Sequence, residues 1–324
     1  MLRTGMTAWR RYPMWIAPSV AALLVLAPTG ASPQAAKKPT PPPAQRSGTV
    51  ERIKKTGSLK LGYRSDAVPF SFKDQSGNPS GYSVQLCQAL SDAIKSELAL
   101  PDLKVEWVPL TVENRIEAVQ RHEVDAECGA VTSTLERRKQ VSFSSPIFPG
   151  GVGVVVRSDA PARFRNILAG GAKNYSPTWR AVALNILREQ IFATLPATTA
   201  EQFLQQRGRE LDVEARVTPV TSYEAGLQAV NSRQANAFFA ERAILLESVK
   251  DNPAYKKLEV IDRQFTYEPL ALVLPRDDED FRLLVDTGLS QIYNSPGFAA
   301  MYSKWFGEPS KETVTFFRWS AAPK

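Results

Sequence analysis

Three arginines, Arg64, Arg115 and Arg137, stand out between residues 59 and 139 of this chain. Each follows an apolar segment and lies where a strand or loop gives way to a helix or turn. A guanidinium group carries a fixed positive charge and a planar fork of donors that matches a carboxylate. Fixed charges at the edges of elements suit the capture of a small anion better than the building of a core. Nothing else in the sequence has the pattern of a catalytic site, so binding of an anion is the main functional signal.

Residues that bind metals or carry out redox chemistry are few. His122 is the only histidine, and Cys87 and Cys128 are the only cysteines. A structural zinc site usually needs four Cys or His ligands, and a CxxC motif is missing from the sequence. We therefore expect no metal site and no cofactor.

The formal net charge of +7 comes mostly from the N-terminal segment. Residues 1–46 hold six Lys or Arg side chains and no acidic one, so subtracting them leaves a net charge of +1. No later cluster of Lys and Arg alternates with aromatic residues, as a nucleic-acid-binding surface would require. We expect no nucleic-acid partner.

The N-terminus has the three-part plan of a secretory signal peptide. Arg3, Arg10 and Arg11 precede an apolar stretch, residues 14–31, which ends in small residues. We expect residues 1–31 to be a signal peptide cleaved near Ala31, and the protein to be periplasmic.

An uncleaved membrane anchor is the alternative, because the stretch approaches the ~17–25 residues needed to cross a bilayer. Pro18 and Pro28 interrupt the stretch. Because no cysteine lies at its end, we do not expect a lipid anchor. Export implies an oxidising compartment. Residues 32–47 read as a Pro-rich linker outside any packed core.

Predicted strands and helices alternate along the rest of the chain. We expect strands over residues 58–63, 104–108, 124–128 and 152–156, with helices over 81–98 and 111–121. A second series has strands over 190–194, 214–219, 235–239 and 270–274, with helices from residue 198 or 199 and over 223–230, 281–294 and 297–306. This alternation predicts an α/β fold with mainly parallel sheets, and the length suggests two domains. Residues 160–178, rich in Gly, Pro and Arg, are expected to form a surface loop or insertion.

Five segments together resemble one protein family. They are GYRSDAVPFSF (62–72), GNPSGYSVQLCQAL (77–90), TVENRIEAVQ (111–120), VDAECGAVTSTLERRKQVSFSSPIF (124–148) and YSKWFG (302–307). Their order and spacing resemble the periplasmic solute-binding proteins of amino-acid ABC importers, family 3, and within it the glutamate/aspartate-binding branch. The resemblance spans roughly residues 50–307 and is strongest from 58 to 150.

The resemblance implies a fold and a function. The fold is a two-lobe periplasmic binding protein of type II, hinged by two crossover strands near residues 147–151 and 264–268. Lobe 1 would comprise residues 48–149 and 266–324, and lobe 2 residues 150–265. The implied function is extracytoplasmic binding of an amino acid, acidic in this branch, by a monomer that delivers it to a membrane-embedded ABC permease.

The resemblance also implies how the ligand backbone is held. Arg137 matches the arginine that grips the ligand α-carboxylate, and Thr132 with the backbone after Gly129 assists it. Glu241 stands where the family usually has an aspartate that pairs with the α-ammonium group. The alternatives are a surface role for Arg137, simple strand-end turn chemistry for Thr132 and the backbone after Gly129, and a salt bridge between Glu241 and Arg242.

Arg64 and Arg115 match arginines that contact the distal carboxylate of acidic ligands in this branch. The alternative for Arg64 is a solvated loop charge, and for Arg115 a place on a helix surface. Phe70 stands where an aromatic ring commonly stacks on the ligand, although a core position is nearly as well supported.

Three positions depart from the branch pattern. Val112 and Ala130 stand at serine positions, and Tyr223 replaces a histidine. Each lost hydrogen bond to a charged ligand group would cost ~1.5–3 kcal/mol unless another donor substitutes. Glutamate, aspartate, glutamine and an opine-like anion therefore stay open as ligands.

The segment LPATTAEQFL (195–204) resembles the family loop that begins a helix in lobe 2. Thr198 and Thr199 can cap this helix while its free N–H groups meet the carboxylate. A plain N-cap is the alternative. Ala197 replaces the usual glycine, so a positive φ there would be strained.

Cys87 is expected on the apolar face of its helix and Cys128 on an adjacent strand. In an exported protein this suggests a disulfide within lobe 1, with two buried thiols as the alternative.

Two other functions compete with a transport receptor. A few relatives of these binding proteins are dehydratases, but an enzyme needs a positioned general acid or base, and His122 is expected at a surface. The second is a ligand-sensing receptor module, for which we would expect a further domain after the match.

Overall fold

The computed structural model describes residues 48–170 and 180–323. The predicted signal peptide and Pro-rich linker, residues 1–31 and 32–47, lie outside the described residues. In the parts of the chain described, no helix is long and apolar enough to span a bilayer.

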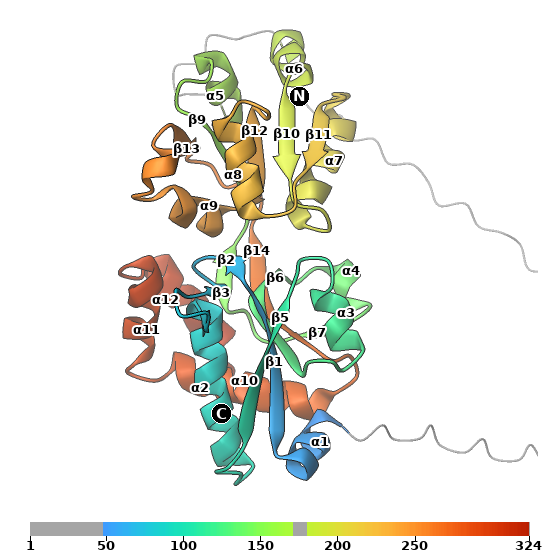
Figure 1. Cartoon of the computed structure of the whole chain (residues 1–324), viewed down its shortest axis with the longest axis vertical. Helices are drawn as coiled ribbons and strands as arrows, with labels where there is room; N and C mark the ends of the chain where they lie inside the picture. The colour runs from blue at the N-terminus through green and yellow to red at the C-terminus, as the bar shows by residue number, and fades with distance from the viewer. Residues whose placement is uncertain (1–47, 171–179, 324) are drawn as a thin grey trace, which may run out of the picture. The chain divides into compact units, whose positions relative to one another are not determined.

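Two large mixed sheets and one small sheet organise the described chain (Figure 1). The first sheet has the order β5 (Lys104–Leu110), β1 (Ser58–Arg64), β6 (Ala126–Thr132), β14 (Glu268–Leu274) and β7 (Ser142–Phe143), and β8 (Phe148–Gly150) also pairs with β14. Strand β1 pairs in parallel with β5 and β6, whereas β14 runs antiparallel to β6, β7 and β8. The small sheet contains β2 (Asp66–Ala67), β3 (Ser71–Lys73) and β4 (Pro79–Ser80).

Both faces of the first sheet are buried, as the run of apolar residues in β14 shows. Leu270, Leu272 and Leu274 pack into one cluster, while Ala271 and Val273 pack into another. This alternation follows from the two-residue period of a strand. The helices of this part of the fold are α1 (Thr49–Thr56), α2 (Tyr82–Glu97), α3 (Arg115–Gln120), α4 (Leu135–Arg138), α10 (Glu279–Tyr293), α11 (Phe298–Phe306) and α12 (Lys311–Ser320). Helices α2 and α10 pack against each other on the first face, and α3 covers the second.

The second sheet repeats this plan. Its order is β11 (Arg216–Pro219), β10 (Ile191–Thr194), β12 (Ala237–Glu241), β9 (Val152–Arg157) and β13 (Leu258–Val260). Strand β10 is parallel to β11 and β12, and β9 is antiparallel to β12 and β13. Phe238 and Phe239 face opposite clusters, so this sheet is also buried on both faces. The accompanying helices are α5 (Ala162–Leu168), α6 (Arg180–Arg188), α7 (Thr199–Leu211), α8 (Tyr223–Asn231), α9 (Arg242–Val249) and the 3-10 helix η1 (Pro253–Tyr255).

The chain passes between the two sheets twice. Strand β8 belongs to the first sheet and β9, which follows at once, to the second; the return runs from β13 to β14. The α/β, two-lobe type II prediction is thereby confirmed, with one refinement. The sheets are mixed because the crossing strands β9 and β14 run antiparallel to their neighbours. The exact lobe limits, 48–149 plus 266–324 and 150–265, stay a prediction.

Three local predictions need correction. The helix expected from residue 111 begins at Arg115, because residues 111–114 form a turn in which Asn114 Oδ1 accepts from the Thr111 N–H. The expected loop over 160–178 contains helix α5, whose Phe164 and Leu168 are buried; residues 171–178 lie outside the described residues. Helix α12, which buries Phe317, has no counterpart in the sequence prediction.

Cys87 on α2 and Cys128 on β6 form a disulfide. Both residues are fully buried in the larger cluster of the first sheet. The bond ties the helix to the strand that lies at the centre of that sheet.

Candidate ligand-binding site

A small pocket gathers most of the predicted ligand-binding residues. It is lined by Arg115, Ala130, Thr132, Arg137, Val152, Leu195, Thr198, Thr199, Ala200, Tyr223, Ala240 and Glu241. All the predicted ligand-binding residues except Arg64 and Phe70 are among them. Most of the lining residues lie at the ends of strands in the two large sheets or at the first residues of the helices that accompany these sheets.

Arg137 projects from the short helix α4, which Thr134 caps by accepting from the Arg137 N–H. Its Nη1 donates to the Thr132 carbonyl and its Nη2 to the Ala197 carbonyl, both at 2.9 Å. Burial, together with the nearby charge of Arg115, lowers the pKa of Arg137 to about 10. The guanidinium therefore stays charged at neutral pH and its fork links elements from both sheets.

Two threonine hydroxyls meet at one carboxylate oxygen. Thr132 Oγ1 and Thr199 Oγ1 donate to Glu268 Oε2 at 2.8 and 2.7 Å, and Thr266 Oγ1 donates to the other oxygen at 2.6 Å. Glu268 begins β14, the returning crossing strand. Glu268 is not among the site residues predicted from the sequence. The signal that could have found it is an acidic residue within a predicted crossing.

The helix α7 begins at the pocket, as the sequence predicts. Thr198 is its N-cap and accepts from the Glu201 N–H, while Thr199 is its first residue. Ala197 has φ of 58°, so the expectation of backbone strain at this position is confirmed. Its carbonyl, held in this way, accepts the bond from Arg137.

Glu241 ends β12 and caps helix α9. Its carboxyl oxygens accept from the N–H groups of Gly151 (3.0 Å) and Ala243 (3.3 Å). Burial raises the pKa of Glu241 to about 8, against the lowering effect of these two bonds. The alternative pairing with Arg242 does not form, because Arg242 pairs with Asp262 instead.

Arg115, the first residue of α3, is buried. Its Nη1 lies 3.5 Å from the Ala130 carbonyl. Burial lowers the pKa of Arg115, and the neighbouring carboxyl of Glu127 opposes this. Glu127 is itself fully buried, and neither of its oxygens has a hydrogen-bond partner among the described residues. Glu127, two residues before Gly129 in the quoted motif, is likewise not among the site residues predicted from the sequence.

Tyr223 begins α8, whose N-cap is Ser222. Burial raises the pKa of Tyr223 to about 12, so its hydroxyl stays protonated. Val112, at one of the serine positions, is buried within a cluster of the second sheet. Tyr223 thus adds one hydroxyl to the pocket, and Val112 serves packing.

Arg64 and Phe70 do not line the pocket. Arg64 is buried at the end of β1 and pairs with Asp66. Phe70 is a correction: it is fully buried and packs edge-on against Phe148, with Tyr82 also adjacent, because its loop folds back onto α2. A ring enclosed in this way belongs to the core.

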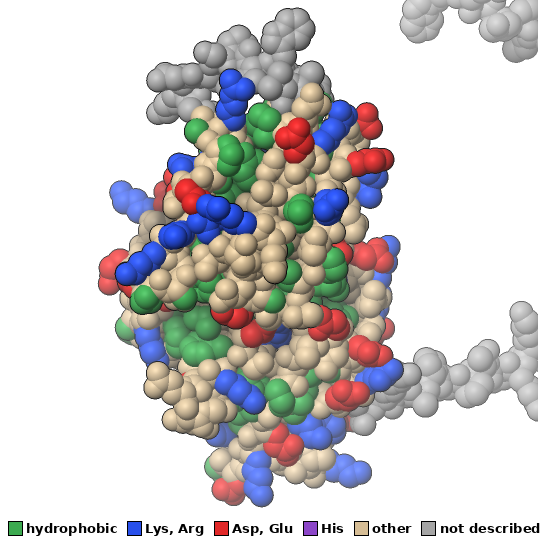
Figure 2. All heavy atoms as spheres, turned by 45° about the horizontal axis from the view of Figure 1, so that its top comes forward, with side chains coloured by type: hydrophobic (Ala, Val, Ile, Leu, Met, Phe, Trp, Pro, Cys, Tyr) green, Lys and Arg blue, Asp and Glu red, His purple; other side chains and the backbone are tan. Residues whose placement is uncertain are grey.

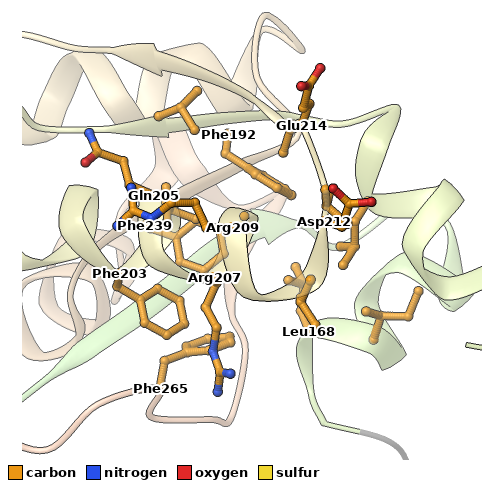
Figure 3. Close-up of a pocket in the computed structure, with 18 of the residues that line it drawn as sticks. Leu168, Phe192, Phe203, Gln205, Arg207, Arg209, Asp212, Glu214, Phe239 and Phe265 are labelled. Atoms are coloured by element: carbon orange, nitrogen blue, oxygen red, sulfur yellow. The ribbon is translucent and has the colours of Figure 1, made fainter.

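A second, larger cavity of ≈ 660 Å³ lies in the part of the fold built on the second sheet (Figure 3). Aromatic rings of Phe192, Phe203, Phe239 and Phe265 line it, with the side chain of Arg207 beside Phe265. None of the predicted ligand-binding residues lines this cavity.

On the face shown in Figure 2, basic and acidic side chains are interspersed among neutral ones.

Comparisons with known proteins identify relatives of this chain. The family model of the bacterial extracellular solute-binding proteins, family 3, matches residues 59–308. The chain is 27% identical over 261 residues to a glutamate/aspartate import solute-binding protein of Escherichia coli (strain K12), covering 81% of this chain and 80% of the relative. It is 29% identical over 297 residues to an L-glutamate/L-aspartate-binding protein of Pseudomonas aeruginosa, covering 91% and 90%.

Solved structures show the same fold. An ancestral amino acid-binding protein, AncCDT-1, described as a precursor of cyclohexadienyl dehydratase, has a TM-score of 0.64 and 26% identity, covering 80% of this chain and 99% of that one. An arginine-binding protein from T. maritima, a mutant, has a TM-score of 0.65 at 22% identity, covering 80% and 99%. The family match extends over most of the sequence and includes both sheets. This chain belongs to the bacterial extracellular solute-binding proteins of family 3.

Proposed function

We propose that this chain binds an amino acid outside the cytoplasm and delivers it to a membrane-embedded ABC permease. The observation that carries the proposal is the pocket in which Arg137, Thr132, Thr199 and Glu241 converge. Two hydroxyls and a guanidinium fork can hold an α-carboxylate, and the free N–H groups at the start of α7 favour an anion. Glu241 can pair with the α-ammonium group.

We assign the far end of the pocket to the ligand side chain. Arg115 supplies a buried cation there, and Tyr223 supplies a hydroxyl. This favours an acidic, glutamate- or aspartate-like ligand, as bound by the relatives named above. Removal of the N-terminal segment near Ala31, a periplasmic location and a monomeric state are parts of the same proposal.

Capture of the ligand would involve closure of the two lobes about the two crossing segments. A ligand that bridges residues on both sheets binds the closed arrangement better than an open one, and so shifts the population toward closure. The permease would then recognise the closed form.

Isothermal titration of the purified protein with L-glutamate, L-aspartate, L-glutamine and neutral amino acids tests the proposal. We expect saturable heat with an acidic or polar amino acid. Absence of heat with every acidic and polar amino acid would refute it. Mass spectrometry of ligand released from freshly purified protein identifies the bound compound independently.

An enzyme on the same fold is the competing function, and Glu241 is the observation that favours it. A buried carboxyl whose pKa is raised to about 8 could act as a general acid. His122, by contrast, is exposed and does not line the pocket. We expect no turnover of a prephenate-like acid, as followed by its absorbance. Turnover that Glu241→Gln abolishes would establish the enzyme instead.

A further inference from the structure

Arg64 already has a carboxylate partner within the protein. Its Nε and Nη2 both donate to Asp66 Oδ1, at 3.0 and 2.5 Å. The Arg64 side chain is 4% exposed, whereas that of Asp66 is 32% exposed. Asp66 lies in β2 of the small sheet, two residues after Arg64. The pair is therefore half enclosed and its cationic member is buried.

Arg64 lies directly beside the residues that line the pocket. A Cβ placed on Gly129 would lie 3.4 Å from Arg64 Cγ. The next residue, Ala130, lines the pocket, and its carbonyl faces Arg115 Nη1. Burial lowers the pKa of Arg115, and the positive charge of Arg64 lowers it further. Arg64 is thus a second cation beside the end of the pocket assigned to the ligand side chain, although it does not line the pocket.

Both cations near this end have a protein carboxyl group in their surroundings. Asp66 pairs with Arg64, and the buried Glu127 interacts with Arg115. A ligand carboxylate that reached this end would have to compete with Asp66 for the Arg64 fork and would bring a further negative charge close to it. A ligand amide of the same shape would meet no such repulsion.

We propose that Asp66 is a specificity-determining residue that occupies Arg64 and so reduces the preference of the pocket for an acidic over an amide side chain. The inference rests on the proposed function, because it assumes an amino acid in the pocket. It predicts that the ratio of L-glutamate to L-glutamine affinity is held down by one side chain outside the pocket lining.

The test compares both ligands by isothermal titration on the full chain and on Asp66→Asn and Asp66→Ser. Glutamine is the matched probe because it differs from glutamate in the charge of the side-chain end. Freeing Arg64 for a charge-assisted bond should raise the glutamate-to-glutamine affinity ratio about tenfold in both variants. Adding Arg64→Met to Asp66→Asn should remove this gain. The exposure of Asp66 favours folding of these variants, which thermal unfolding checks.

The chain offers a matched control pair. Arg157 and Asp159 have the same two-residue spacing, and Arg157 Nε and Nη2 likewise donate to the carboxylate, at 2.7 and 2.8 Å. Neither residue lines the pocket. Asp159→Asn should leave both affinities unchanged.

The outcomes separate this inference from the proposed function. An unchanged ratio in folded Asp66→Asn and Asp66→Ser overturns the inference, as does an equal loss of affinity for both ligands, which would indicate a structural role. If the unaltered protein binds no amino acid at all, the proposed function itself fails.

Discussion

Glu241 is a buried acid whose protonation the pocket controls. Its pKa of about 8 means that it is largely protonated in the ligand-free protein at pH 6 to 7. An α-ammonium group can pair only with the carboxylate, so binding must release a proton. The proposed ligand therefore binds by drawing Glu241 into its charged form.

We predict that affinity for the amino acid rises with pH between 6 and 8, by at most about tenfold per pH unit, since one proton is released. Isothermal titration in buffers of different ionisation enthalpy measures both the affinity and the released proton. Glu241→Gln should bind weakly and show little pH dependence over this range. An affinity that falls as pH rises would contradict the assignment.

Burial of Glu241 also makes the stability of the fold depend on pH, and here stability falls as pH rises, whereas the predicted affinity rises. Its folded-state pKa lies above the ordinary value of 4.5, so the folded state binds the proton more tightly than the unfolded chain. This contribution is complete below about pH 4.5 and is lost as pH rises toward 8.

Arg137 provides the second prediction for a single residue. Arg137→Lys keeps a positive charge but removes the planar fork, so affinity for the amino acid should fall about ten- to a hundredfold. The neighbouring Arg138 is exposed and its Nε bonds to Ser133 Oγ. Arg138→Lys should therefore bind normally in the same titration. Equal effects of the two substitutions would place the carboxylate elsewhere.

Among the elements, the start of α7 combines a cap, a strained residue and a pocket wall. Ala197 holds a left-handed conformation that glycine adopts more readily. We predict that Ala197→Gly raises the free energy of unfolding by about 0.5–1 kcal/mol. Denaturant unfolding measures this value. Ala93→Gly, within α2, should instead destabilise by about 1 kcal/mol. A lower free energy of unfolding for Ala197→Gly would contradict the strain assigned to Ala197.

The crossing strand β14 brings a carboxylate to the hydroxyls that the ligand is proposed to use. Glu268 Oε2 accepts hydrogen bonds from the hydroxyls of Thr132 and Thr199. An arriving α-carboxylate has to replace these bonds and approach a negative charge.

We therefore predict that Glu268→Gln raises affinity for the amino acid about tenfold, because neutral hydrogen bonds are weaker than charge-assisted ones. The control is Glu279→Gln, on the exposed start of α10, which should have no effect on the titration. Weaker binding by Glu268→Gln would mean that this carboxylate supports the site rather than competes with its ligand.

At the scale of the whole molecule, the disulfide joins helix α2 to β6, the central strand of the first sheet. Cys87 and Cys128 are separated by 41 residues. Closing a loop of this length should stabilise the fold by about 3–4 kcal/mol through the entropy of the unfolded chain. The double substitution Cys87→Ser/Cys128→Ser should lose this amount in denaturant unfolding. Reductant should lower the unfolding midpoint of the unaltered protein but not that of the double variant; equal midpoints without reductant would contradict the prediction.

The local pattern determined much of this fold. Strand β1, helix α2 and strand β9 lie within two residues of their predicted limits, because apolar periodicity and turn residues act over short distances. Helix α12 escaped prediction because Phe317 and its neighbours become an apolar face only against a cluster formed by distant residues. Phe70 was ambiguous for the same reason, since a ring at a loop position can serve a ligand or a core.

The sequence by itself determined which residue types are available: the arginines, the threonines before α7, and an acid near the end of β12. Side-chain chemistry and order along the chain are properties of a sequence alone. Only the tertiary structure decided their partners. It paired Arg64 with Asp66, placed Glu127 beside Arg115 and brought Glu268 to two threonines. The physical reason is that electrostatic interactions depend on distance and burial, and both are set only when the sheets assemble.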